Sequence, residues 1–172
     1  MGMYIAAGVI LLLVCLYLFC IAPRAKKKKF DIPNVGYAHR GLWDGEKPEN
    51  SLAAFAAAVE RGYGIETDVR LTKDGIPVLF HDETLERVCG DPRRVIDCTY
   101  EELSKLRLCG TDEKIPTLAA LIELSKKKIP LLIELKGESL ATELCEKIAP
   151  LLDPLGSSVV VESFNPDRKS VV

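Results

Sequence analysis

From about residue 35 onward, short apolar runs alternate with longer amphipathic stretches. The predicted strands are runs of strand length bounded by turn or polar residues: 35–38, 65–71, 76–80, 130–136 and 159–164. The predicted longer helices carry apolar residues three or four positions apart: 52–61, 116–128 and 139–152. Asn50 or Ser51 is the expected N-cap of the first helix, Gly62 its stop, and Thr99 the N-cap of a short helix.

Strands that alternate with helices predict a parallel sheet covered by helices. Our first choice is an α/β fold of the TIM-type (β/α) barrel, because the charged residues stand at the C-terminal ends of strands. A doubly wound open sheet is the second choice, since spacing alone does not separate the two. The runs 65–71 and 76–80 are too close for a parallel crossover and predict an antiparallel hairpin. If Asp74 and Gly75 form its loop, His81 lies opposite Asp68.

The N-terminal segment is apolar and is followed by basic residues. Residues 3–22 contain no charged side chain, and a helix of this length can cross the roughly 30 Å hydrocarbon core of a bilayer. A secretory signal peptide would have its positive charges before the apolar run. We therefore expect a single-pass transmembrane anchor at 1–23, a basic juxtamembrane linker at 24–34 and a folded domain at 35–172. The excess of Lys and Arg after the run places that domain in the cytoplasm.

Composition narrows the classes of function. A net charge of -2 argues against general nucleic-acid binding, which usually needs a basic face. Six cysteines without C-x-x-C spacing indicate neither a zinc site nor a disulfide framework, and they fit a reducing compartment.

The chain has two histidines, His39 and His81, and each follows a short apolar strand. Either one alone could be a structural histidine. Two of them beside acidic strand ends favour acid/base chemistry, because imidazole exchanges protons near neutral pH.

Three carboxylates occupy the predicted strands. Glu66 and Asp68 are two positions apart on one strand and therefore point the same way, and Glu134 lies on a later strand. Carboxylates this close repel each other, and a hard divalent cation such as Ca²⁺ or Mg²⁺ would neutralise them. The alternative is a solvated strand face with Arg70 as the ion-pair partner.

Two cations accompany these groups. Arg40 follows His39 directly, and Lys136 shares a strand face with Glu134. Both residue types bind phosphate oxygens, although either side chain could instead balance the carboxylates. A metal and two cations around two histidines favour phosphate-ester chemistry over sugar or hydride chemistry.

Several sequence blocks together resemble the glycerophosphodiester phosphodiesterase family. They follow the family's order and approximate spacing between residues 35 and 164: Ala-His-Arg-Gly at 38–41, Pro-Glu-Asn-Ser-Leu-Ala-Ala-Phe at 48–55, Glu-Thr-Asp-Val-Arg-Leu-Thr-Lys-Asp-Gly at 66–75, Val-Leu-Phe-His-Asp-Glu-Thr-Leu at 78–85 and Ile-Glu-Leu-Lys at 133–136. Glu49 and Asn50 match as well, but an acidic residue and a cap are favourable at any helix start.

The resemblance implies a barrel of the phospholipase C-like phosphodiesterase type that hydrolyses glycerophosphodiesters to glycerol 3-phosphate and an alcohol. It also implies a role for each matching residue: His39 and His81 as the acid/base pair, Glu66, Asp68 and Glu134 as ligands of one divalent cation, Arg40 and Lys136 as phosphate contacts. The glycerophosphodiester is the expected substrate, and the membrane is the expected partner through the N-terminal helix.

The family's barrel has eight strands, whereas we count four barrel strands before Val172. We therefore expect residues 35–172 to be the N-terminal portion of a barrel truncated at its C-terminus. Two alternatives remain open: a related barrel phosphodiesterase acting on sphingolipid or lysophospholipid headgroups, and an inactive fragment that only binds metal or phosphate. The sequence leaves the oligomeric state open.

Overall fold

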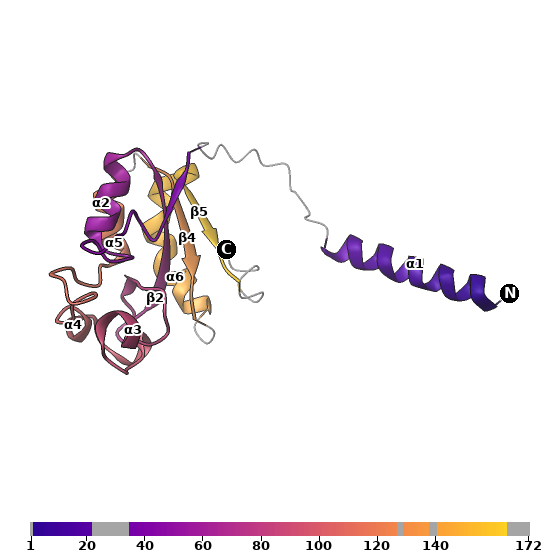
Figure 1. Ribbon diagram of the computed structural model, residues 1–172, viewed down its shortest axis with the longest axis horizontal. Coiled ribbons are helices and arrows are strands. Elements are labelled where there is room, and N and C mark those ends of the chain that lie inside the picture. Colours follow the sequence, from indigo (N-terminus) through magenta and orange to yellow (C-terminus); the bar gives the residue numbers. More distant parts are fainter. Residues whose placement is uncertain (1, 22–34, 127–128, 138–140, 165–172) are drawn as a thin grey trace. The chain divides into compact units, whose positions relative to one another are not determined.

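The structure is a computed structural model that describes residues 2–21, 35–126, 129–137 and 141–164 (Figure 1). It divides into two compact units, Met1–Phe30 and Asp31–Val172, which are considered separately below. The predicted basic linker at 24–34 lies outside the described residues.

In the first unit the structure describes residues 2–21, which form helix α1 (Gly2–Ile21). In the described part of the chain, no helix is both long enough and apolar enough to span a membrane. The expectation of a single-pass membrane protein anchored by residues 1–23 is therefore wrong. The cytoplasmic placement of the second unit was inferred from that anchor and loses its basis.

The second unit is built on a mainly parallel sheet. Its strands are β1 (Tyr37–His39), β2 (Gly64–Leu71), β3 (Pro77–Leu79), β4 (Leu131–Leu135) and β5 (Val159–Glu162). The order β1-β2-β4-β5 is parallel throughout, and β3 pairs antiparallel with β2. The parallel strands thus follow one another in chain order, as in a (β/α) barrel, whereas a doubly wound sheet reverses its order at a switch point.

The helices of this unit lie at or near their predicted positions, except α3, which falls in a segment where no helix was predicted. They are α2 (Leu52–Glu60), α3 (Glu86–Cys89), α4 (Tyr100–Leu103), α5 (Leu118–Ser125) and α6 (Ala141–Leu152), with 3-10 turns at Val95–Asp97 and Asp153–Ser158. Figure 1 shows α2 and α5 side by side against the sheet.

Caps explain the helix boundaries. The Ser51 hydroxyl accepts the Ala54 N–H at 3.1 Å and starts α2, while Thr99 forms a capping box with Glu102 at the start of α4. Helix α5 is shorter than predicted because Thr117 caps it at one end and Lys126 takes the left-handed conformation, φ 48°, at the other.

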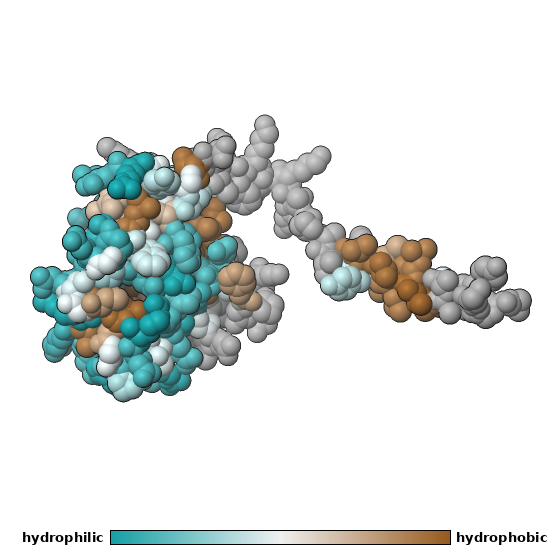
Figure 2. All heavy atoms as spheres, viewed as in Figure 1, coloured by the Kyte–Doolittle hydropathy of each residue, from teal (hydrophilic) through white to brown (hydrophobic). Residues whose placement is uncertain are grey.

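Two apolar clusters support the sheet. In the larger one, Ile65 and Val69 of β2 are fully buried with Phe55 of α2 and Leu121 of α5. The smaller one joins Val78 of β3 to the connecting segment that precedes α5. On the face drawn in Figure 2, the surface of this unit is mostly hydrophilic. The apolar face of β2 therefore packs on the helices and leaves Glu66 and Asp68 on the opposite face.

The predicted hairpin is confirmed, but its register differs from the prediction by one residue. Leu71 pairs with Pro77, and the Phe80 N–H donates to the Asp68 carbonyl at 3.0 Å, so Asp68 lies opposite Phe80 and not His81. The cause is a three-residue loop closed by Thr72 and Ile76, with Gly75 at φ +74°. Such loops end in a left-handed residue, a position that favours glycine.

Candidate active site

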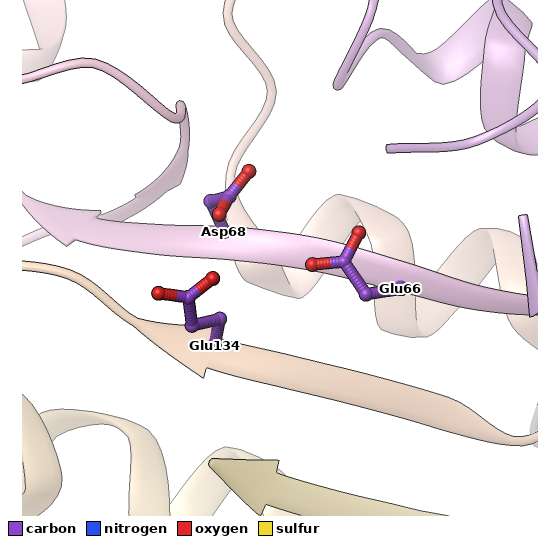
Figure 3. A group of neighbouring side chains, drawn as sticks. All are labelled: Glu66, Asp68 and Glu134. Carbon is purple, nitrogen blue, oxygen red and sulfur yellow. The ribbon is translucent and has the colours of Figure 1, made fainter. Parts of the chain in front are cut away.

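The charged residues converge where β1 and β4 end, on either side of the middle of β2. The β1–β2 register places His39 beside Glu66, and the β2–β4 register places Asp68 beside Glu134. In Figure 3 the carboxylates of Glu66 and Asp68 from β2 and of Glu134 from β4 turn toward one common space. Strand register alone therefore assembles the predicted acidic group.

This acidic group is buried and compact. Glu66, Asp68 and Glu134 are 7%, 1% and 8% exposed, and one oxygen from each lies within 4.8 Å of the others. Buried like charges are unfavourable unless a cation compensates them. Three carboxylate oxygens around one space are ligands that suit a hard divalent cation, so the residues present fit such an ion.

Protein cations partly compensate the group. Lys136 Nζ lies 2.6 Å from Glu134 Oε1 and 3.2 Å from Asp68 Oδ1, and Arg40 Nε lies 3.3 Å from Asp68 Oδ2. The pKa of Glu66 is nevertheless raised, first because the carboxyl is buried and second because Asp68 is near. Asp68 and Glu134 thus each have a lysine or arginine side chain beside them. The negative charge of Glu66 is the least favourable of the three, as its raised pKa indicates.

Arg40 is held in a special conformation beside Glu66. Its φ is +59°, and its backbone N–H donates to Glu66 Oε2 at 3.0 Å. Its Nη1 donates to Glu49 Oε1 at 3.0 Å, whereas its buried Nε makes the 3.3 Å ion pair with Asp68 but no hydrogen bond among the described residues. This N–H group therefore lies within the site, beside the most deeply buried carboxylate.

Gly41 allows this turn to approach α2. A Cβ on Gly41 would lie 2.8 Å from the Ala54 carbonyl carbon, and its φ is +82°. The Leu42 N–H also donates to the Ala54 carbonyl at 2.9 Å. The segment that carries His39 and Arg40 is therefore fixed directly against the first helix.

Asn50, which the sequence offers only as a possible helix cap, is a residue of the site. Ser51, not Asn50, caps α2; Asn50 is 2% exposed with φ +55°. Its Nδ2 donates to Asp68 Oδ2 at 3.1 Å, and its Oδ1 accepts the Thr67 hydroxyl at 2.8 Å. The amide therefore fixes the orientation of the most deeply buried carboxylate.

The two histidines occupy different environments. His39 Nε2 lies 3.9 Å from Glu66 Oε2, and its side chain is 66% exposed. The ring of His81 instead forms a 2.7 Å hydrogen bond between Nδ1 and Asp82 Oδ1. The His81 carbonyl accepts Nε and Nη2 of Arg70 at 3.0 and 2.7 Å. The structure thus brings His39 to the carboxylates and gives His81 a carboxylate partner of its own.

Comparisons with known proteins agree with these features. The model of the Glycerophosphoryl diester phosphodiesterase family matches residues 39–171. Human glycerophosphodiester phosphodiesterase 1 is 38% identical over 141 residues, which cover 76% of this chain and 42% of the human protein. A glycerophosphodiester phosphodiesterase of Caldanaerobacter subterraneus is 41% identical over 142 residues, covering 74% of this chain and 57% of that protein.

Solved structures give the same relationship. A phosphodiesterase of Oleispira antarctica in complex with the product sn-glycerol-3-phosphate has a TM-score of 0.72 and 34% identity, covering 78% of this chain and 59% of that one. A glycerophosphodiester phosphodiesterase of Thermotoga maritima has a TM-score of 0.66 and 33% identity, covering 78% and 55%. The chain thus spans about half the length of the relatives it matches. On this match, the chain belongs to the Glycerophosphoryl diester phosphodiesterase family.

Proposed function

We propose that this protein hydrolyses glycerophosphodiesters to glycerol 3-phosphate and an alcohol, with the help of one divalent cation. The observation that carries the proposal is the buried group of Glu66, Asp68 and Glu134, whose ligand atoms lie within 4.8 Å of one another. The relative that was solved with sn-glycerol-3-phosphate supports the choice of product.

Glu66, Asp68 and Glu134 would hold the cation, either Ca²⁺ or Mg²⁺. A bound cation polarises phosphoryl and hydroxyl oxygens and so supplies Lewis-acid chemistry. Asn50 contributes by fixing Asp68 through its Nδ2 hydrogen bond. Lys136, whose Nζ lies 2.6 Å from Glu134 Oε1, would stand next to this cation and the substrate phosphate.

Arg40 and Lys136 would bind the phosphate. The Nε of Arg40 and the ammonium of Lys136 each lie beside an oxygen of Asp68, at 3.3 and 3.2 Å. A phosphodiester anion at this place would meet positive charge from both. Arginine adds directional N–H donors, and lysine adds a point charge.

His39 and His81 would move the protons. In the first step, one histidine takes the proton of the glycerol 2-hydroxyl as its oxygen attacks phosphorus, and the other gives a proton to the departing alcohol. In the second step the roles reverse: water opens the cyclic phosphate, and the proton returns to the 2-oxygen. The count of protons balances over the two steps, as acid/base catalysis requires.

The test is release of glycerol 3-phosphate from glycerophosphocholine by the full chain, compared with His39→Ala and His81→Ala. Loss of one acid/base group is expected to lower turnover by about 10²–10⁴-fold. Turnover that persists in His39→Ala would overturn the paired-histidine mechanism. Turnover only on lysophospholipid or sphingolipid substrates would reassign the substrate, and cation binding without any turnover would indicate a binding fragment.

A further inference from the structure

A chain of alternating charges connects Arg40 at one end to His81 at the other. It runs through Arg40, Glu49, Arg87, Asp82 and His81, which come from the β1–α2 connection, the end of β3 and helix α3. Directly bonded members lie up to 38 residues apart in the sequence, at Glu49 and Arg87. The central member is Arg87, which neither the sequence motifs nor the proposed mechanism uses.

The guanidinium of Arg87 binds a carboxylate on each side. Its Nη2 and Nη1 donate to Glu49 Oε1 and Oε2 at 2.7 and 3.0 Å. Its Nε and Nη2 donate to Asp82 Oδ2 and Oδ1 at 2.6 and 3.1 Å. Two-point pairing of this kind fixes both position and plane, which a single ion pair does not.

Each carboxylate then contacts a proposed active-site residue. Glu49 Oε1 accepts Nη1 of Arg40 at 3.0 Å, and Asp82 Oδ1 lies 2.7 Å from Nδ1 of His81. A carboxylate on Nδ1 keeps that nitrogen protonated and leaves Nε2 as the free acceptor. Arg70 holds the His81 carbonyl with two donors, so the residue is fixed at its backbone and at its ring.

The pKa values agree with a tightly paired network. The pKa of Asp82 is lowered to about 2, first by the hydrogen bond from Arg87 and then by that from His81. For Glu49, burial alone would raise the pKa, but Arg87 and Arg40 outweigh it and the pKa is lowered. Both carboxylates are therefore ionised at neutral pH and remain acceptors.

We propose that Arg87 is a positioning residue that sets His81 through Asp82 and Arg40 through Glu49, so that the proton-transfer group and the phosphate-binding group keep one geometry. The role in catalysis rests on the proposed function. The arrangement of His81 does not, because it can be observed without substrate.

Arg87→Gln is the test variant, and Arg93→Gln is its matched control. Arg93 is similarly exposed, 44% against 50% for Arg87, and it also binds two carboxylates, Asp91 and Glu102. The described contacts of the Arg93 side chain are to Asp91 and Glu102, outside the chain of charges. Arg87→Lys retains the charge but not the planar two-sided fork.

The first measurement is the ¹⁵N spectrum of the imidazole nitrogens in the full chain, above the pH at which the rings titrate. Two histidines make assignment simple, since His39→Gln leaves the His81 signals. We expect His81 to be protonated at Nδ1 in the wild type and in Arg93→Gln, and to become a mixture of tautomers in Arg87→Gln. An unchanged Nδ1–H form in Arg87→Gln would overturn the proposal.

The second measurement is the kinetics of glycerol 3-phosphate release. Loss of an outer partner of an active-site group costs about 10–100-fold, so Arg87→Gln should lower kcat by that factor, with partial recovery in Arg87→Lys. Arg93→Gln should remain within about twofold. Equal effects of the two Gln variants would overturn the positioning role. If the wild type has no turnover, the proposed function fails, and the tautomer result still decides the positioning of His81.

Discussion

At the scale of single residues, the electrostatic repulsion among the three buried carboxylates is the main unfavourable interaction of the site. Asp68 and Glu134 each have a protein cation within 3.3 Å, whereas burial and the charge of Asp68 raise the pKa of Glu66. A divalent ion bound here would relieve this repulsion and would stabilise the fold by mass action.

Glu66→Gln tests whether a bound cation relieves this repulsion and stabilises the fold. A cation at 100 times its Kd stabilises the wild type by about 2.7 kcal/mol, and the variant should lose most of this gain. In chelator the variant should be at least as stable as the wild type, because one buried charge is gone. Thermal unfolding with Ca²⁺, with Mg²⁺ and with chelator measures both effects. Glu101→Gln, at an 82% exposed position, is the control, and an equal cation response in both variants would contradict the assignment.

Asp82 makes a second prediction, on acid stability. Its pKa of about 2 lies below the ordinary 3.8, so its stabilisation is present above pH 3.8 and disappears as the pH falls toward 2. Asp82→Asn removes this contribution. The stability difference between the two proteins, measured by urea unfolding from pH 5 to pH 2, should therefore shrink across that interval. A difference that stays constant would show that Asp82 gains nothing from Arg87 and His81.

At the scale of elements, the hydrophobic pattern predicted most of what the structure contains. Strand alternation correctly separated Ile65 and Val69, which pack on helices, from Glu66 and Asp68, which face the site. The hairpin register was missed because the pattern does not distinguish a two-residue from a three-residue loop. That difference moved His81 away from Asp68 by one position.

The remaining misses have one physical cause. The pattern before α2 indicates only a cap at Asn50. The contact of its amide with Asp68 requires a positive φ, which depends on how the loop before α2 packs. Arg87 gave no signal at all, since its partners Glu49 and Asp82 belong to separate segments. Contacts between distant segments are tertiary features, and local patterns do not encode them.

The close approach of the β1–α2 turn to α2 makes a prediction at this scale. Gly41→Ala would place a Cβ 2.8 Å from the backbone of Ala54 and force alanine to a φ of +82°. Strain of this kind costs on the order of 1–3 kcal/mol, and the clash adds to it. Gly45→Ala is the control because nothing lies within 4 Å of its Cβ. Urea unfolding should separate the two variants, and equal stabilities would mean that the turn is free to move.

At the scale of the whole molecule, the second unit carries the site on consecutive parallel strands. The order β1-β2-β4-β5 brings residues from positions 39 to 136 together across the neighbouring strands β1, β2 and β4. One core cluster of sheet and helix side chains supports these strands.

The central claim is that hydrolysis depends on a cation held by Glu66, Asp68 and Glu134. The most direct measurement is the rate of glycerol 3-phosphate release from glycerophosphocholine by the full chain while free Ca²⁺ or Mg²⁺ is varied. We predict a rate that falls to background in excess chelator, returns when the cation is restored and saturates as the site fills. A rate that is the same in excess chelator as in excess cation would contradict the account.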